Sequence, residues 1–198
     1  MINKLSYKLN YIFFLFLEMS RFYYFGYGSN LLQERIRLSN KSAEFVGIGS
    51  VSDYKLSFYR FSERWKGATA TIEEAENNQV IGCVWTMLES DLENIDKQEG
   101  VPQKVYRPIY VDVKTSENKL IKCRSYQIID TSESGLPSDA YKSVIVSGAK
   151  QNNLPKDYVQ KLEAIKSNGV KDVEILNFIN NSKQKSKQEI ARVNGDEQ

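Results

Sequence analysis

The sequence predicts a single domain that combines β-strands with α-helices. Runs rich in β-branched and aromatic residues recur between residues 43 and 129, which is typical of strands. Beyond residue 139, apolar residues recur every three or four positions, which is typical of amphipathic helices. The chain has 198 residues, of which 41% are hydrophobic and 26% are charged. It is therefore long enough for one sizeable core and has the composition of a soluble globular protein.

Several segments have the composition of strands. The predicted strands are Ala43–Val51, Tyr54–Phe61, Ala68–Glu74, Val80–Leu88, Val105–Lys114 and Leu120–Ile129. Glu76–Asn78 and Thr115–Asn118 have the composition of turns between neighbouring strands. Because Val80–Leu88 is almost wholly apolar, we expect it to be a central strand that is buried on both faces.

A short glycine-containing stretch, Tyr23–Asn30, connects a strand-like aromatic run to the helical pattern Leu31–Ile36. Its two glycines allow positive φ angles and a close approach of the backbone to a ligand. Ser29 or Asn30 is expected to cap the helix that follows. Backbone N–H groups at such a strand-to-helix turn suit a carboxylate or another anionic oxygen. An ordinary glycine-rich turn has the same pattern, and the motif alone is weak.

The chain contains no histidine, which excludes several common chemistries. Ser-His-Asp and Cys-His catalysis are ruled out, as are His-ligated zinc and most catalytic transition-metal sites. Any proton transfer must therefore use Glu, Asp, Lys, Tyr or Cys. The net charge of +2 gives no electrostatic reason to expect nucleic acid or an anionic membrane surface as a partner.

The two cysteines, Cys83 and Cys123, lie in apolar strand-like runs. We expect them to be core thiols of a reduced protein, which predicts a cytoplasmic location. A disulfide between them is the alternative, although two cysteines do not make a disulfide scaffold.

A capping box predicts a helix after Val80–Leu88. Ser90 is its expected N-cap, Glu93 follows three residues later, and Gly100 is the natural stop. Such a helix would end close to Gln98 or Glu99.

Glu99 lies on the apolar stripe of this helix, at helical spacing from Leu92 and Ile95. A carboxylate in that position is desolvated, which should raise its pKa and makes it an active-site candidate. Two alternatives fit the spacing equally well. Glu99 could fray into solvent at the helix end, or it could pair with an arginine such as Arg107 or Arg124.

Two further helices are predicted nearer the C-terminus, followed by a weak terminal helix over Val173–Ile179. Their buried faces are Tyr141, Val144, Ile145, Gly148 and Ala149 for the first, and Tyr158, Leu162 and Ile165 for the second. The small residues Gly148 and Ala149 indicate close backbone packing, and Pro155 opens the second helix.

The two ends of the chain are expected to lie outside the folded domain. The apolar run Tyr11–Leu17 is too short to span a bilayer, and Met19 could serve as a start in its own right. We therefore expect residues 1–18 to be an N-terminal extension and residues 19–180 to form one domain. Residues 181–198 are rich in Lys, Gln and Ser, so they are expected to be a disordered tail. The alternative for the extension is a targeting or anchoring segment.

Several separate motifs, in matching order, resemble those of γ-glutamylcyclotransferases. They are Phe25–Asn30, Asp96–Val101, Tyr106, Cys123–Tyr126 and Tyr141–Lys150, in a match that runs from about Tyr23 to Asn168. The resemblance implies a fold of the α+β class, a small mixed β-barrel with surrounding helices. It also implies the reaction, in which a small-molecule γ-glutamyl amino acid becomes 5-oxoproline and a free amino acid without a metal or other cofactor. Asn30 favours the branch of the family that takes free γ-glutamyl amino acids.

For this reaction, the desolvated carboxylate of Glu99 is our candidate to take a proton from the substrate α-amine and return it to the leaving amine. The resemblance implies roles for other residues. The residues implied to bind the glutamyl group are Tyr24, Phe25, Gly26, Tyr27, Gly28 and Ser29, with Tyr126 as a further substrate contact. Tyr106 matches another pocket tyrosine, although core packing is an equally good role for it. Arg124 is expected to be structural.

Two other functions fit the sequence. One is a glutathione-specific cyclotransferase, and the other is a non-catalytic binding protein that uses the same pocket. A binding protein needs no buried base, so Glu99 argues against the second. The resemblance further suggests a homodimer that has no membrane or nucleic-acid partner.

Overall fold

The computed structural model describes residues 20–171, 173–182 and 184. The expected extension, residues 1–18, lies outside the described residues. Of the expected tail, only residues 181, 182 and 184 are described, and the first two continue a helix that begins at residue 174. No helix in the described part of the chain is long and apolar enough to cross a membrane.

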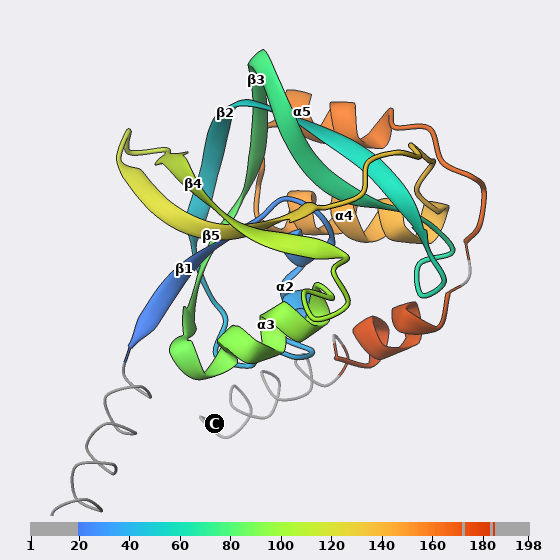
Figure 1. Ribbon diagram of the computed structural model, residues 1–198, viewed down its shortest axis with the longest axis horizontal. Coiled ribbons are helices and arrows are strands. Elements are labelled where there is room, and N and C mark those ends of the chain that lie inside the picture. Colours follow the sequence, from blue (N-terminus) through green and yellow to red (C-terminus); the bar gives the residue numbers. More distant parts are fainter. Residues whose placement is uncertain (1–19, 172, 183, 185–198) are drawn as a thin grey trace, which may run out of the picture.

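The strands close into a barrel, with helices packed around it (Figure 1). The strands are β1 (Arg21–Gly26), β2 (Glu44–Ser62), β3 (Gly67–Leu88), β4 (Tyr106–Thr115) and β5 (Leu120–Ile128). Their order around the barrel is β1-β3-β2-β4-β5, and β1 closes the circle through a parallel pair with β5 at Tyr24 and Arg124. All other strand pairs are antiparallel. The expected α+β class with a small mixed barrel is confirmed.

The predicted strands between residues 43 and 88 merge into the two long strands β2 and β3. The ladder between these strands shifts register between Ser52 and Tyr54, where Asp53 and Asn77 both adopt positive φ. The backbone N–H of Asn77 donates to Oδ1 of Asp53 at 3.0 Å. The turn predicted at Glu76–Asn78 is therefore an irregularity within β3 and does not separate two strands, because short polar side chains tolerate this conformation and bond across it. Figure 1 shows β3 bending sharply near its label.

Helices follow β1, β3 and β5 along the chain. The helical elements are η1 (Ser29–Leu31), α2 (Gln33–Ile36), η2 (Glu89–Asp91), α3 (Leu92–Gln98), α4 (Asp139–Gln151) and α5 (Lys156–Glu163). The predicted capping box is wrong, because Ser90 lies inside η2 and no side chain caps η2 or α3. The cap of α4 is Ser138, whose side chain accepts a hydrogen bond from the backbone N–H of Tyr141.

Helix α4 packs closely against the segment that follows β1. All residues of its predicted apolar face are buried. A Cβ on Gly148 would lie 2.4 Å from the backbone nitrogen of Leu32, so no larger residue fits without movement of the backbone. The small residues therefore have the packing role that the sequence indicated.

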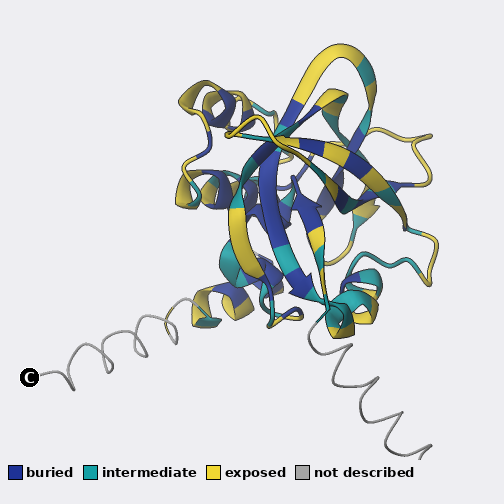
Figure 2. Ribbon diagram, turned by 90° about the vertical axis from the view of Figure 1, so that its left-hand side faces the viewer, coloured by how far each residue is buried: buried dark blue, intermediate teal, exposed yellow. Residues whose placement is uncertain are grey.

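The core fills the barrel interior, where long stretches of the central strands are buried (Figure 2). Val80, Val84 and Trp85 of β3 are almost fully buried, which confirms a central strand over Val80–Leu88. Cys83 and Cys123 are free and buried, as expected of core thiols. Burial raises the pKa of the Cys83 thiol to about 12, so this group is a poor nucleophile.

Candidate active site

The loop that leaves β1 forms one wall of a small cavity. Neither Gly26 nor Gly28 has a positive φ angle, contrary to what the pattern suggested. Both positions are tight for a side chain. A Cβ on Gly28 would lie 3.3 Å from both Oη of Tyr141 and Cβ of Ala70, and one on Gly26 would lie 3.1 Å from the carbonyl oxygen of Asn30. The loop is therefore held close to β3 and α4 by packing.

Asn30 joins this loop to Glu99. Its Nδ2 donates to Oη of Tyr24 at 2.9 Å and to Oε1 of Glu99 at 2.9 Å. Its Oδ1 accepts from Nε2 of Gln98 at 3.1 Å. The expectation that Ser29 or Asn30 caps a helix is wrong, since neither η1 nor α2 has a side-chain cap. The amide of Asn30 is satisfied instead by a carboxylate, which is a stronger acceptor than a neutral group.

The end of helix α3 fixes the position of Glu99. Glu99 is the C-cap, and Gly100 follows with a φ angle of 68°. The N–H of Gly100 donates to the carbonyl of Lys97 at 3.1 Å, and the N–H of Val101 donates to the carbonyl of Asp96 at 2.9 Å. This pair of bonds is a Schellman motif, which ends a helix at a defined residue. Gly100 thus stops the helix as predicted, and Glu99 does not fray.

Burial raises the pKa of the Glu99 carboxyl above its usual value. The positive charge of Arg35 has the opposite effect on this pKa, as do the hydrogen bonds from Gln98 and Asn30, but these do not cancel the effect of burial. Nε2 of Gln98 donates to Oε1 of Glu99 at 3.2 Å. Although the residue as a whole is half-buried, its carboxyl group faces the protein interior. The raised pKa favours a group that takes and returns a proton near neutral pH.

Glu99 forms no ion pair with either arginine that the sequence offered as a partner. Arg124 pairs with Asp96 at 2.8 Å, and Arg107 donates to Oε1 of Gln127 at 2.7 Å. The structural role expected for Arg124 is consistent with this pairing, which ties β5 to α3.

Buried tyrosines surround the carboxylate. Oη of Tyr106 donates to the carbonyl of Ala70 at 2.7 Å, so this residue both packs in the core and borders the cavity. Burial raises the pKa values of Tyr24 and Tyr106 well above 10 and that of Tyr141 to about 12. These hydroxyls are therefore protonated at neutral pH and available as hydrogen-bonding groups. Tyr126 also borders the cavity, and its hydroxyl donates to the carboxylate of Asp96.

The cavity between these groups has a volume of about 30 Å³. Its lining residues are Tyr24, Tyr27, Gly28, Ser29, Asn30, Ala70, Glu99, Tyr106, Tyr126 and Tyr141. The structure thus brings together most of the residues that the sequence singled out. Phe25 and Gly26 do not line it. Phe25 is fully buried in the barrel, where its carbonyl accepts from Oγ of Ser125 at 2.9 Å.

A second cavity, of about 180 Å³, adjoins the first. The two share Ser29, Glu99, Tyr106 and Tyr141, so the Glu99 side chain lies where they meet. Within the described residues, no group of three or more His, Cys, Asp or Glu side chains is arranged to hold a metal ion.

Known proteins are similar in sequence to this chain over most of its length. A family model described as the AIG2-like family matches residues 79–162. The γ-glutamylcyclotransferase of Bos taurus is 49% identical over 154 residues, which is 76% of this chain and 81% of that protein. The γ-glutamylcyclotransferase of Homo sapiens is 46% identical over 151 residues, which is 74% of this chain and 80% of that protein. The chain belongs to the γ-glutamylcyclotransferase family.

Solved structures support the same assignment. A γ-glutamyl cyclotransferase that is 43% identical superposes with a TM-score of 0.76 and covers 82% of this chain and 99% of its own. The family fold therefore extends over the barrel and the helices that carry the candidate site.

In this γ-glutamylcyclotransferase family member, sequence reasoning missed several neighbours of the carboxylate. Asn30 was recognised as part of the loop but not as a partner of Glu99. Gln98 and Tyr141 lay in the motifs that carried the resemblance, so their positions were a usable signal. Nothing in the sequence indicated that Arg35 is a buried neighbour of Glu99, because an arginine in a short polar helix normally faces solvent.

Proposed function

We propose that the protein converts γ-glutamyl amino acids into 5-oxoproline and the free amino acid, with Glu99 as the group that moves the proton. The observation that carries this proposal is the Glu99 carboxylate at the cavity wall, held by Asn30 and Gln98, with its pKa raised by burial. The fit of the chain to the family supports the same reaction.

In this reaction the substrate supplies its own nucleophile. The α-amine nitrogen bonds to the γ-carbonyl carbon, and the bond from that carbon to the amide nitrogen breaks. The ammonium form of the amine has a pKa near 8, so a proton must leave before attack. Glu99 would take it and then deliver it to the departing nitrogen, so no water is consumed. Holding the glutamyl chain in the ring-closing conformation can lower the barrier by about 7–11 kcal/mol.

The loop after β1 offers hydrogen-bond donors for the glutamyl group. Within the described residues, the backbone N–H groups of Gly28, Ser29 and Asn30 donate no hydrogen bond to another backbone or side chain. The hydroxyl of Tyr24 accepts from Asn30 and keeps its own hydrogen for another acceptor. These groups would hold an anionic oxygen of the substrate, either its α-carboxylate or the oxyanion that forms on attack.

The first experiment is to incubate the protein with γ-glutamyl-alanine and, separately, with glutathione, and to measure 5-oxoproline. The proposal expects product from γ-glutamyl-alanine. Product from glutathione alone would instead identify a glutathione-specific enzyme. Binding of γ-glutamyl-alanine without product would identify a binding protein.

A substitution at Glu99 tests the role of this residue. Glu99→Gln keeps the shape of the side chain and removes its basicity, so turnover should fall by roughly 10²- to 10⁴-fold while the protein stays folded. Glu93→Gln is a matched control, because Glu93 lies on the exposed side of the same helix and pairs with Lys97. Near-normal turnover by Glu99→Gln would rule out the proposed base.

We further propose that the protein is a homodimer and lies in the cytoplasm. The family resemblance supports the first statement, and the two free buried thiols support the second. Light scattering would measure the oligomeric state, and cell fractionation would locate the protein.

A further inference from the structure

Arg35 is a buried charge on which the charge of Glu99 acts, but which forms no direct ion pair among the described residues. Only 4% of the residue is exposed. Its Nη1 donates to Oε1 of Gln98 at 2.9 Å, which is a neutral acceptor. Within the described part of the chain, its Nε is buried without a partner and its Nη2 donates no hydrogen bond. A guanidinium taken out of water is costly unless an anion pairs with it, so the unused N–H groups of Arg35 could bind a negatively charged ligand.

Arg35 lines the second cavity, the one next to Glu99. Arg60 and Arg64 also line this cavity, and Glu99 is its one acidic lining residue. None of these three arginines forms an ion pair among the residues that the structure describes. Three guanidinium groups therefore face one carboxylate, which leaves the cavity with an excess of positive charge.

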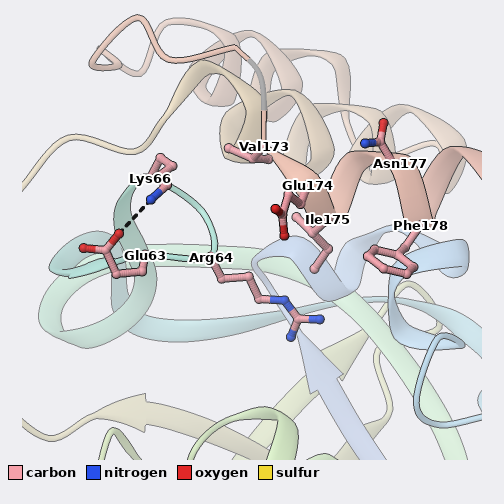
Figure 3. Close-up of a pocket in the computed structure, with 8 residues that line it drawn as sticks. All are labelled: Glu63, Arg64, Lys66, Val173, Glu174, Ile175, Asn177 and Phe178. Atoms are coloured by element: carbon pink, nitrogen blue, oxygen red, sulfur yellow. Dashed lines mark hydrogen bonds and ion pairs between the residues drawn. The ribbon is translucent and has the colours of Figure 1, made fainter.

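The turn between β2 and β3 places Arg64 at the outer wall of this cavity. Figure 3 shows a neighbouring cavity that Arg64 also lines, where Lys66 of the same turn pairs with Glu63 at 2.7 Å. Arg64 extends away from that pair and lies beneath the C-terminal helix near Ile175. Among the described residues, Arg64 forms no ion pair with Glu63 or with Glu174, which also lines the neighbouring cavity. Arg60 and Arg64 are both exposed, so they form the rim of the cavity while Arg35 forms its floor.

The position of the leaving group in the proposed reaction determines which part of the substrate lies near these arginines. The leaving nitrogen must lie beside Glu99 to receive its proton, and under the proposed function the glutamyl group binds on the tyrosine-lined side. The rest of the leaving amino acid then extends into the second cavity. In an α-amino acid, the carboxylate is only two bonds from that nitrogen, so it comes to the side of Glu99 where Arg35 lies.

We propose that Arg35, with Arg60 and Arg64 at the rim, binds the carboxylate of the leaving amino acid. This inference rests on the proposed function and adds a determinant of specificity to it. The enzyme then selects γ-glutamyl α-amino acids over γ-glutamyl amides that lack this carboxylate. The planar fork of arginine suits a carboxylate, and the wall formed by Trp65, which lies 6.0 Å from the Arg35 guanidinium, keeps this pair away from water.

The test compares two substrates that differ in this one group, γ-glutamyl-alanine and γ-glutamyl-ethylamide. Both contain the whole glutamyl half, and only the first has a carboxylate on the leaving half. The wild-type protein should show a kcat/KM for γ-glutamyl-alanine that is roughly 10- to 100-fold higher, as expected for a charged hydrogen bond. In Arg35→Gln, and in the double variant Arg60→Gln with Arg64→Gln, this preference should shrink at least several-fold.

Arg107→Gln is the matched control, because Arg107 is exposed, bonds to Gln127 and does not line the cavity. It should leave the preference unchanged. An equal loss of activity toward both substrates in the arginine variants would overturn the proposal, because it would place these residues at the glutamyl half or in a purely structural role. Equal use of both substrates by the wild type would overturn it as well.

The same experiment separates this inference from the proposed function. If the wild type forms 5-oxoproline but shows no preference, only the carboxylate subsite is wrong. If neither substrate yields 5-oxoproline, the proposed function is wrong and the subsite is overturned with it. Circular dichroism of Arg35→Gln checks its folding, and the rim variant decides the question if that protein is unfolded.

Discussion

Glu99 owes its properties to the last turn of a short helix. Its spacing from Leu92 and Ile95 indicated a desolvated carboxylate, because periodicity shows which face of a helix turns inward. Fraying into solvent and pairing with an arginine fitted the same spacing equally well, and the structure was needed to decide between them. The residues that hydrogen-bond to this carboxylate could not be predicted from the sequence. Asn30 is far from Glu99 along the chain, and a side-chain hydrogen bond across such a separation leaves no local pattern.

Glu99 should make the stability of the protein depend on pH. Its pKa is raised in the folded state by burial, so the folded protein holds this proton at pH values where the unfolded chain has lost it. The stabilising contribution is therefore complete below the unfolded pKa and is lost as the pH rises through the folded pKa. Glu99→Gln should remove this loss. Urea unfolding from pH 4 to pH 8 should show the variant gaining stability relative to the wild type as the pH rises, and a constant difference would contradict the raised pKa.

Asn30→Ala should weaken catalysis through Glu99. Loss of the bond from Nδ2 of Asn30 to the carboxylate removes one interaction that lowers the pKa of Glu99. We expect kcat/KM to fall roughly 10- to 100-fold, with the acidic limb of the pH–rate profile moved to higher pH. Asn94→Ala, at an exposed position on α3, is the control and should keep the wild-type profile. An unshifted acidic limb in Asn30→Ala would show that this bond does not tune the base.

At the scale of elements, the contact of α4 with the loop after β1 positions the site. Gly148 lies against the backbone of Leu31 and Leu32, and Tyr141 of the same helix reaches Gly28 with its hydroxyl. A shift of α4 would therefore move both the loop and a lining tyrosine.

Gly148→Ala should destabilise the protein, although alanine is the better helix former. The added Cβ would lie 2.4 Å from the backbone nitrogen of Leu32, and a backbone cannot yield as a flexible side chain does. We expect a loss of about 1–3 kcal/mol in the free energy of unfolding, together with reduced turnover. Gly47→Ala is the control, because a Cβ there meets nothing within 4 Å and should change stability by less than about 0.5 kcal/mol. Equal effects of the two substitutions would argue against the close packing.

The elements themselves were predicted with uneven success, for physical reasons. The hairpin of β4 and β5 and the apolar face of α4 follow directly from alternation and helical spacing. The long strands β2 and β3 were divided in the prediction, because Asp53 and Asn77 resemble turn residues although the ladder resumes beyond them. The capping box failed at Ser90 because the chain forms a 3₁₀ turn before α3.

At the scale of the whole molecule, side-chain bonds tie α3 both to the barrel and to α2. Asp96 pairs with Arg124 of β5 and accepts from the hydroxyl of Tyr126, while Gln98 accepts from Arg35. These contacts set the position of Glu99 relative to the loop after β1. Closure of the barrel depends on a parallel contact between β1 and β5, two distant segments, so only the family resemblance predicted it.

Asp96→Asn should loosen this connection. It leaves the mostly buried Arg124 without its ion-pair partner, so the free energy of unfolding should fall by about 1–3 kcal/mol, as for loss of a charged hydrogen bond. The expected kinetic result is a lower kcat, because Glu99 is carried by the same helix. Asp112→Asn, at an exposed position on β4, serves as the control in urea unfolding. Unchanged stability of Asp96→Asn would show that α3 is held mainly by its apolar face.

The positions of the two tryptophans allow ligand binding to be followed by intrinsic fluorescence. Trp65 borders the arginine-lined cavity and packs against Tyr141 in a tilted arrangement, with ring centroids 4.7 Å apart. Trp85 of β3 is fully buried, and its ring packs edge-on against that of Phe45. A ligand that fills the cavity changes the surroundings of the first indole and leaves those of the second alone. Intrinsic fluorescence therefore reports occupancy directly, and it does so even in variants that have lost all turnover.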